Sequence, residues 1–253
     1  RDRSSDQCLK RARSATGGQS HSQVESDDGP PAGSLISLAL LSGIGVIAGW
    51  MTITLTVALL ARQQRPEQPE LSRKIVHIGM GAVIPLAWHF GIPAVIAIPF
   101  AVFVTLGTAI NHRWRMIPAV EDVDRNSYGT IAYGLAITLL LLMYWPERAD
   151  SVCAGVLVMA LGDGLAGLIG REVPSPRWSI LKQTKSVVGT ATMLVVSLLV
   201  VIGLAGCIGR DPGWSAAMAI AIAATGLEQL SPGGIDNLSV PLAVSLLWNS
   251  FVS

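Results

Sequence analysis

The sequence predicts an all-α fold, a polytopic bundle of transmembrane helices, and three observations predict it. The chain of 253 residues is 51% hydrophobic and only 14% charged, which is more apolar than a soluble domain. Long apolar runs recur along the chain after residue 34. These runs are continuous rather than alternating, which favours helices over strands, and only helices and closed barrels cross a bilayer.

Eight apolar runs supply the predicted spans. They cover residues 35–61, 75–90, 92–110, 128–145, 150–170, 187–208, 213–229 and 236–253. A helix needs about 20 residues to cross a bilayer, and most of the runs reach that length, although the second is short. Because the pair between residues 75 and 110 is two helices only if the chain breaks at residues 91–93, we expect seven or eight spans.

Residues 1–34 differ from the rest because they are polar and rich in Ser, Gly and charged side chains. This composition predicts a disordered tail. Its basic, Ser-rich beginning also fits the remnant of an organelle transit peptide, although Asp2 and Asp6 are unusual for one. We therefore predict two parts, a polar tail over 1–34 and an integral membrane domain over 35–253.

The charges are sorted into alternate loops, which predicts an orientation. The basic residues of one set of loops are Arg62, Arg65, Arg73, Lys74, Arg113, Arg115, Arg125, Arg171, Arg177, Lys182 and Lys185. The opposite loops hold only Arg148 and Arg210, apart from the basic tail, which would fall on that side and which we expect to be removed or mostly neutralised. The positive-inside rule therefore places the first set in the cytoplasm or stroma. A net charge of +1 gives no global field that would indicate a nucleic-acid partner.

Residues 159–192 are the most informative stretch of the chain. Asp163 lies inside an apolar, glycine-rich run, where an acid is costly and usually functional. The surrounding glycines, Gly162, Gly164, Gly167 and Gly170, are typical of closely packed helices. Packing explains the glycines but not Asp163, which needs a cation or a metal ion as its partner.

Basic residues on the same membrane side indicate phosphate binding. Arg73, Lys74 and His77 begin one run, and a helix would place Arg73 and His77 on one face. A second group comprises Lys182, Lys185, Ser186, Gly189 and Thr190. Lysine binds phosphate as a point charge, although lysines that snorkel at the interface or that only set the topology would give the same pattern.

A third candidate phosphate site lies at the predicted start of the fourth run. Arg125, Ser127, Gly129 and Thr130 stand there, and the free backbone N–H groups of a helix start can hold a phosphate. The simpler alternative is that Ser127 only caps the helix. Farther along, Glu228 and Asp236 add two acids on the same side, and together with Asp163 they would provide oxygen ligands for Mg²⁺.

Five segments, in this order, resemble the phytol kinase and dolichol kinase family of membrane prenol kinases. They are ELSRKIVHIGMG, RNSYGTIAY, ALGDGLAGLIGR, KQTKSVVGT and LEQLSPGGIDNLSVP. The resemblance covers about residues 70–245 and looks closest to the phytol kinase branch. Some relatives have Glu before the glycine of the fourth segment, where this chain has Val188, and that departure favours a phytol-like over a dolichol-like assignment.

The resemblance implies a function. A family member would transfer the γ-phosphate of a nucleoside triphosphate, typically CTP, to the hydroxyl of an isoprenoid alcohol such as phytol. It would need Mg²⁺, would contribute to tocopherol synthesis through salvaged phytol, and would lie in a bacterial inner, thylakoid or plastid membrane. The sequence does not choose among phytol and other prenols, among CTP, UTP and ATP, or among oligomeric states.

The corresponding mechanism is in-line phosphoryl transfer at the interface. Asp163, with Asp236 or Glu228, would hold Mg²⁺, and the basic side chains, among them Lys185, would neutralise the triphosphate. The amides of residues 127–130 and 186–190 would cradle phosphates. Such transfer depends mainly on positioning and charge, so a strong base is not required, and His77 is the best candidate for one.

Two alternatives remain open at this point. A CTP-dependent cytidylyltransferase, which would make a CDP-activated lipid, has broadly similar acid-rich late loops. An ion-coupled transporter would use Asp163 to bind its coupling ion. Transporters often show internal repeats and helices interrupted at the midplane, whereas this sequence shows no clear repeat and its polar residues gather at one interface.

Overall fold

The computed structural model describes residues 32–114, 128–181 and 183–252, with side chains from residue 38. Most of the predicted tail, and Arg115, Arg125, Ser127 and Lys182, lie outside the described residues. The chain divides into residues 1–36 and a second unit, residues 37–253, which contains the features described below apart from the first five residues of α2.

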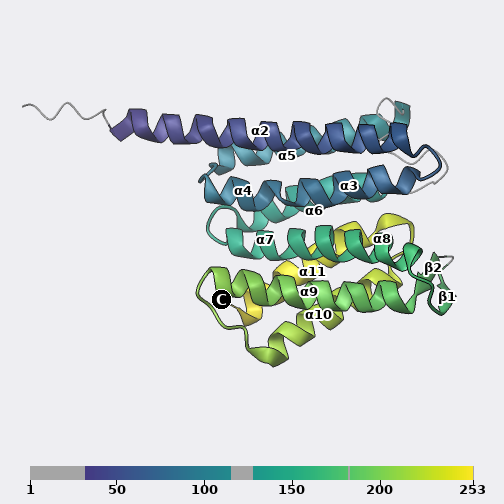
Figure 1. Cartoon of the computed structure of the whole chain (residues 1–253). Coiled ribbons are helices and arrows are strands. Elements are labelled where there is room, and N and C mark those ends of the chain that lie inside the picture. The colour runs from purple at the N-terminus through teal and green to yellow at the C-terminus, as the bar shows by residue number, and fades with distance from the viewer. Residues whose placement is uncertain (1–31, 115–127, 182, 253) are drawn as a thin grey trace, which may run out of the picture. The chain divides into compact units, whose positions relative to one another are not determined.

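The described residues are mainly helical (Figure 1). The α-helices are α2 (Ala32–Gln64), α3 (Pro69–Gly81), α4 (Val83–His89), α5 (Ala94–Trp114), α6 (Gly129–Tyr144), α7 (Ala149–Leu157), α8 (Gly164–Glu172), α9 (Val187–Cys207), α10 (Gly213–Leu230) and α11 (Asp236–Phe251). A π-helical segment, η1 (Val158–Asp163), joins α7 to α8, and a 3₁₀ turn, η2 (Pro232–Gly234), precedes α11. Two strands, β1 (Arg177–Ile180) and β2 (Gln183–Ser186), form a hairpin.

The continuous run α7–η1–α8 occupies the middle of the second unit. It packs against α3 and α4 on one side and against α9 and α11 on the other (Figure 1). The core is centred on it, because Val152, Val156 and Met159 are completely buried. Trp248 of α11 and Met193 of α9 complete this core and are also fully buried.

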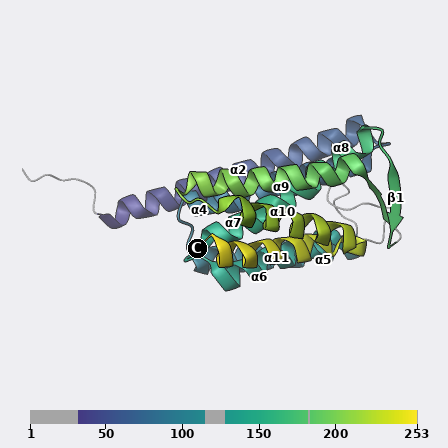
Figure 2. The ribbon, with the colours of Figure 1, turned by 90° about the horizontal axis from the view of Figure 1, so that it is seen from below.

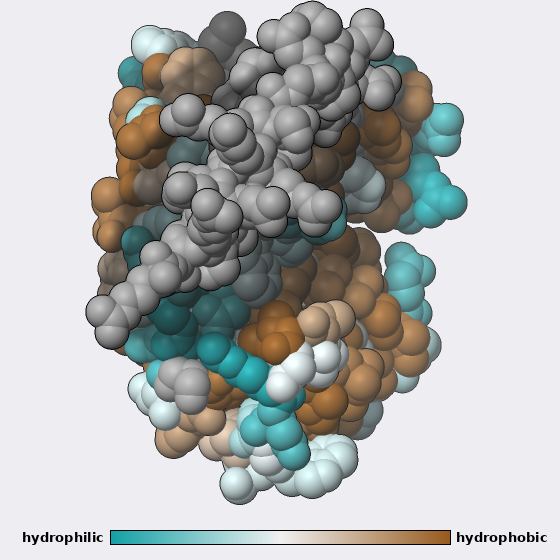
Figure 3. All heavy atoms as spheres, turned by 90° about the vertical axis from the view of Figure 1, so that its left-hand side faces the viewer, coloured by the Kyte–Doolittle hydropathy of each residue, from teal (hydrophilic) through white to brown (hydrophobic). Residues whose placement is uncertain are grey.

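The long apolar helices and the exposed apolar surfaces fit an all-α membrane protein. Four helices are long and apolar enough to cross a bilayer, namely Leu38–Gln64, Ala94–Trp114, Ala149–Glu172 and Val187–Cys207, and the apolar α6 is shorter. Large apolar side chains such as Phe103 (72% exposed) and Leu199 (64% exposed) face outwards, which suits contact with lipid. Figure 3 shows such residues gathered on the flanks of the face that it views. The predicted number of seven or eight spans is not confirmed.

The basic loop predicted between the runs 150–170 and 187–208 contains regular structure that was not predicted, because the chain forms the β1–β2 hairpin there. Pro174 and Pro176 end the preceding helix because proline cannot continue one. The strands pair from Arg177 with Ser186 to Ile180 with Gln183 across a two-residue loop. Leu181 in that loop has φ of 48°, as a tight hairpin turn requires. The hairpin stands at the end of the helices where α8 ends and α9 begins (Figure 2).

The predicted run 150–170 is not a regular α-helix. Residues Val158–Asp163 are π-helical, with i→i+5 hydrogen bonds that place an extra residue in the turn. Segments of this kind are rare and frequently occur at functional sites. Asp163 is the last residue of this widened turn, so the acid lies where the helix geometry changes.

Candidate functional site

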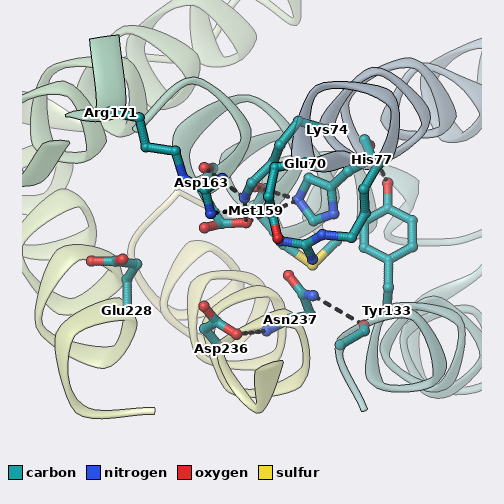
Figure 4. A network of polar contacts seen from close by, with 12 residues as sticks. Glu70, Lys74, His77, Tyr133, Met159, Asp163, Arg171, Glu228, Asp236 and Asn237 are labelled. Atoms are coloured by element: carbon teal, nitrogen blue, oxygen red, sulfur yellow. Dashed lines mark hydrogen bonds and ion pairs between the residues drawn. The ribbon is translucent and has the colours of Figure 1, made fainter. Parts of the chain in front are cut away.

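Most of the predicted polar residues that the structure describes converge on one cavity of about 600 Å³ at the hairpin end of the helices. Its lining includes Arg73, Lys74, Asp163, Gly167, Gly170, Lys185, Ser186, Gly189, Thr190, Glu228 and Asp236. These residues come from α3, η1, α8, β2, α9, α10 and α11, which are far apart in the sequence. Figure 4 shows the acids of three of these elements facing a common space.

Three carboxylates form the centre of the cavity. One oxygen each from Asp163, Glu228 and Asp236 lie within 4.8 Å of one another. Asp163 ends η1, Glu228 belongs to the last turn of α10, and Asp236 begins α11. A set of carboxylate oxygens suits a hard cation such as Mg²⁺ and lacks the thiolate or imidazole donors that a softer metal prefers. These residues therefore fit the predicted metal.

Two lysines already pair with these acids. The Nζ atom of Lys74 lies 2.6 Å from Oδ2 of Asp163 and 3.1 Å from its backbone oxygen. Lys185 pairs with the carboxylate of Glu228 and also donates to its backbone oxygen, at 2.8 Å. Both pairs are largely withdrawn from solvent. Both lysines thus line the same cavity as the carboxylates, where an anionic ligand could reach them.

The glycines around Asp163 each leave room for a neighbour. A Cβ atom at Gly167 would lie 2.7 Å from Cε of Lys74, so this glycine lets the lysine pass to Asp163. A Cβ atom at Gly170 would lie 2.9 Å from Cα of Gly189, so α8 and α9 approach closely there. Gly162 faces Met193 in α9, and Gly164 faces Ile78 in α3.

Glu70 holds two arginines at the rim of the cavity. Its Oε2 accepts a hydrogen bond from Arg73 at 2.7 Å and lies 3.3 Å from a guanidinium nitrogen of Arg171. Burial raises the pKa of Glu70, but attraction and hydrogen bonding from Arg73, with Arg171 and Lys74, outweigh burial and lower it to about 2. Glu70 is therefore ionised at neutral pH and fixes the guanidinium of Arg73 beside the carboxylates.

The first backbone amides of α9 are already hydrogen-bonded, so the side chains there are the groups available to a phosphate. Ser186 caps the helix, since its Oγ accepts from the amide of Gly189 at 3.1 Å. The amide of Val187 donates to the oxygen of Pro176, and that of Val188 donates to Ser175. A phosphate in the cavity would therefore meet the lysines and hydroxyls rather than the amides of residues 187–189.

A second cavity, of about 480 Å³, is apolar and lies among α2, α3, α4, α5 and α6. Gly129 and Thr130, which were predicted to bind phosphate, line this cavity and not the polar one. His77 lines it too. Arg73 and Asn237 line both cavities, so the two spaces meet at these residues.

His77 connects the apolar cavity to Asp163. Its Nε2 lies 3.2 Å from the backbone oxygen of Met159 and 3.3 Å from Oδ2 of Asp163 (Figure 4). The Tyr133 ring lies 4.7 Å from the imidazole, and its hydroxyl donates to the backbone oxygen of His77. Because a carbonyl oxygen can only accept, we assign the proton to Nε2, which leaves Nδ1 as the basic atom.

Several residues of the site were not predicted to have a role. Glu70, Arg171, Gln183, Gln229 and Asn237 line the polar cavity. Glu70, Arg171 and Asn237 stand within the segments that carry the family resemblance, next to predicted residues, and that position was the available signal. Arg125, Ser127 and Lys182 lie outside the described residues, so their predicted roles stay predictions.

The fold and the site define a class, an all-α membrane protein with a carboxylate–lysine site beside an apolar cavity. The chain is 37% identical to the phytol kinase of Synechocystis sp. over 218 residues, which is 84% of this chain and 92% of that protein. It is 30% identical to a probable chloroplastic phytol kinase of Glycine max over 224 residues, 79% and 72% of the two chains. A dolichol kinase of Arabidopsis thaliana matches at 31% over 122 residues, 46% of this chain and 21% of that protein.

No family model matches the sequence, and no solved structure matches it significantly. The similarity to the full-length phytol kinases nevertheless covers most of both chains. The chain belongs to the family of phytol and dolichol kinases.

Proposed function

We propose that this protein phosphorylates an isoprenoid alcohol, namely phytol, with the γ-phosphate of CTP or another nucleoside triphosphate. One observation carries the proposal beside family membership: a polar cavity with three carboxylates and two lysines meets an apolar cavity at Arg73 and Asn237. The first cavity suits a metal-bound triphosphate, and the second suits a prenyl chain. The alcohol end of that chain would lie where the cavities meet.

The reaction joins the alcohol to the terminal phosphoryl group. The alcohol oxygen forms a bond to the γ-phosphorus, the bond from that phosphorus to the bridging oxygen breaks, and the nucleoside diphosphate leaves. The hydroxyl proton passes to Nδ1 of His77, whose Nε2 is held by Met159 and Asp163. The family's products would then be a prenyl monophosphate and a nucleoside diphosphate.

The side chains of the polar cavity position the triphosphate and stabilise its charge. Lys74 and Lys185 exchange part of their pairing with the carboxylates for the phosphate oxygens, and Arg73 is held ready by Glu70. Asp163, Glu228 and Asp236 would hold Mg²⁺, which supplies charge neutralisation at the transferred phosphoryl group. Such positioning and electrostatic stabilisation account for most of the acceleration in phosphoryl transfer.

The proposal includes a location and a role. The excess of basic residues in the loops on the cavity side supports a cytoplasmic or stromal location of the polar cavity, in a bacterial inner, thylakoid or plastid membrane. A prenyl alcohol would reach the apolar cavity from the bilayer, and the nucleotide would arrive from water. Phosphorylation of salvaged phytol for tocopherol synthesis is the role that fits these substrates.

Replacement of Asp163 tests this function. Asp163→Asn should lower the rate of phytol phosphorylation at least about a hundredfold, because it takes away a metal ligand and the charged partner of Lys74 and His77. Glu172→Gln is the matched control, since Glu172 is an exposed acid at the end of α8 outside both cavities. An Asp163→Asn protein that folds and keeps full activity would contradict the assignment.

The assay should identify products as well as rates. Purified protein in detergent would be incubated with labelled CTP, UTP or ATP and a panel of prenols. A prenyl monophosphate with a nucleoside diphosphate supports the kinase. A CDP-lipid with pyrophosphate would instead support a cytidylyltransferase, and no product with any nucleotide, together with ion-dependent flux in vesicles, would support a transporter.

A further inference from the structure

The junction of the two cavities contains a buried hydrogen-bond acceptor without a partner. Asn237 is 4% exposed and belongs to the first turn of α11. Its Nδ2 donates to the backbone oxygen of Gly129 at 3.0 Å (Figure 4). Within the described part of the chain its Oδ1 has no hydrogen-bond partner.

The hydrogen bond to Gly129 fixes which end of the amide is free. A backbone oxygen can only accept, so the Asn237 atom that faces Gly129 must be the nitrogen. The oxygen is therefore the end without a partner, and a flipped amide would lose the only side-chain hydrogen bond described for this residue. A buried acceptor left unsatisfied costs about 1–3 kcal/mol, so a ligand that donates to it gains a corresponding advantage.

Two other polar side chains along the apolar cavity are already engaged. Tyr133 donates its hydroxyl to the backbone oxygen of His77, and Thr108 donates to the backbone oxygen of Thr105. Arg73, the other residue shared by the cavities, has a buried Nε without a partner among the described residues. An acceptor and a donor thus flank the place where the apolar space ends.

A hydroxyl group complements this arrangement, because it has one proton to donate and lone pairs to accept. We propose that Oδ1 of Asn237 accepts the hydrogen bond of the prenol hydroxyl in the complex that precedes transfer, and so selects an alcohol and positions its oxygen toward the phosphoryl group. Rotation about the C–O bond then turns this one proton from Oδ1 of Asn237 to Nδ1 of His77 as the oxygen attacks. The Nε–H group of Arg73 would donate a hydrogen bond to the same hydroxyl oxygen. This inference rests on the proposed function, since it assigns the alcohol site of that reaction.

The test compares two ligands that differ in the hydroxyl proton. Phytol and phytyl methyl ether would compete with a labelled prenol for the full chain in detergent, without nucleotide. The wild type should prefer the alcohol by about tenfold, the equivalent of one neutral hydrogen bond. In Asn237→Ala this preference should disappear. The methyl group adds bulk in both proteins, so only the change in the ratio between proteins is informative.

Thr108→Val provides the matched control. Thr108 lines the apolar cavity but not the polar one, and valine has the same branching at Cβ, so this variant should keep the tenfold preference. A general loss of structure in Asn237→Ala would weaken both ligands equally, whereas the proposed role weakens only the alcohol. If the ratio in Asn237→Ala equals that of the wild type, the inference is overturned.

Two further outcomes keep the test decisive. If Asn237→Ala does not fold, Asn237→Asp retains an acceptor oxygen at the same reach, and it should keep the preference for the alcohol; its loss would overturn the inference. If the wild type binds phytol no better than a hydrocarbon without oxygen, the proposed function itself fails, which is a different result from an unchanged ratio.

Discussion

The pairing of Lys74 with Asp163 is costly at the scale of single residues. The two residues are 89 positions apart in the chain, and their charged atoms meet at 2.6 Å with little solvent. A buried ion pair contributes little net stability, because desolvation of both charges offsets their attraction. The pair, and its counterpart between Lys185 and Glu228, is better explained by a ligand that brings its own charges.

Removal of one carboxylate should weaken metal binding before it affects the nucleotide. Asp236→Asn takes one of three clustered oxygens away but leaves both lysine pairs intact. The Mg²⁺ concentration for half-maximal activity should rise about tenfold or more, which corresponds to at least ~1.4 kcal/mol. Titration of activity with Mg²⁺ at saturating nucleotide measures this, and an unchanged metal requirement would exclude Asp236 as a ligand.

Glu70 should contribute to stability in a defined range of pH. Its pKa is lowered from 4.5 to about 2 by Arg73 and its neighbours, against the opposing effect of burial. Because the folded value is the lower one, the contribution is complete above about pH 4.5 and is lost as the pH falls towards 2. The thermal midpoint of Glu70→Gln should therefore lie below that of the wild type by a constant amount between about pH 6 and 8.

The same difference should shrink below about pH 4.5, because Glu70 is then protonated in the unfolded chain while it is still ionised in the folded protein, so that unfolding takes up a proton. Thermal unfolding in detergent across this range measures it. Glu172→Gln, at an exposed acid of α8, serves as the reference substitution. A difference that grows on acidification would mean that Glu70 is not held ionised by its arginines.

At the scale of elements, the contact of α8 with α9 determines where the hairpin and its Lys185 lie. Gly170 and Gly189 bring these helices together next to Ser186. Gly170→Ala places a Cβ atom 2.9 Å from the backbone of Gly189, so the helices must separate, at a cost of about 1–3 kcal/mol. The thermal midpoint in detergent should fall, and the KM for nucleotide should rise.

Gly203→Ala is the control for this substitution. Gly203 is an exposed glycine of α9, and nothing lies within 4 Å of a Cβ atom placed there. Since alanine suits a helix better than glycine by about 0.5–1 kcal/mol, this variant should be as stable as the wild type or slightly more stable. If both variants behaved alike, close packing of α8 on α9 would not be the cause.

The sequence was most informative about apolar helices and charged clusters, and least informative about breaks in regular structure. Continuous apolar runs predicted the membrane helices. The position of Asp163 among apolar residues led to the prediction that this acid has a functional role. Both signals are local in the sequence. The division of α3 from α4 at Ala82, the β1–β2 hairpin and the π-helical η1 leave only weak local signals. The role of Asn237 depends on Gly129, 108 positions away, and such a pairing cannot be deduced from one sequence.

At the scale of the whole molecule, the two ends of the helices differ in kind. The cavity, its acids and the hairpin occupy one end, whereas Asp150 organises the other. Asp150 accepts hydrogen bonds from Arg148, Arg210 and Trp248, which link the start of α7 to the α9–α10 loop and α11. Because the carboxylate of Asp150 is held by hydrogen bonds from within the protein, Asp150 suits a structural role.

The two ends should lie on opposite sides of the membrane. Cys207 is exposed near the Asp150 end, and Ser179 is exposed in the hairpin. In a protein without Cys8, an impermeant maleimide should label Cys207 from the outside of intact cells. A second protein without Cys8, which carries Ser179→Cys and Cys207→Ala, should be labelled only in inverted vesicles. Labelling of both positions from one side would contradict a spanning arrangement, and reversed labelling would contradict the orientation.

The π-helical turn links the number of residues in η1 to the position of Asp163. A turn of η1 contains one residue more than a turn of α-helix. A chain one residue shorter there could restore a regular helix while α7 keeps its core contacts and α8 keeps its glycine face toward α9. Only the residues of the turn would rotate, and Asp163 is one of them. Family members of different length in this turn would therefore share the fold without sharing the carboxylate arrangement.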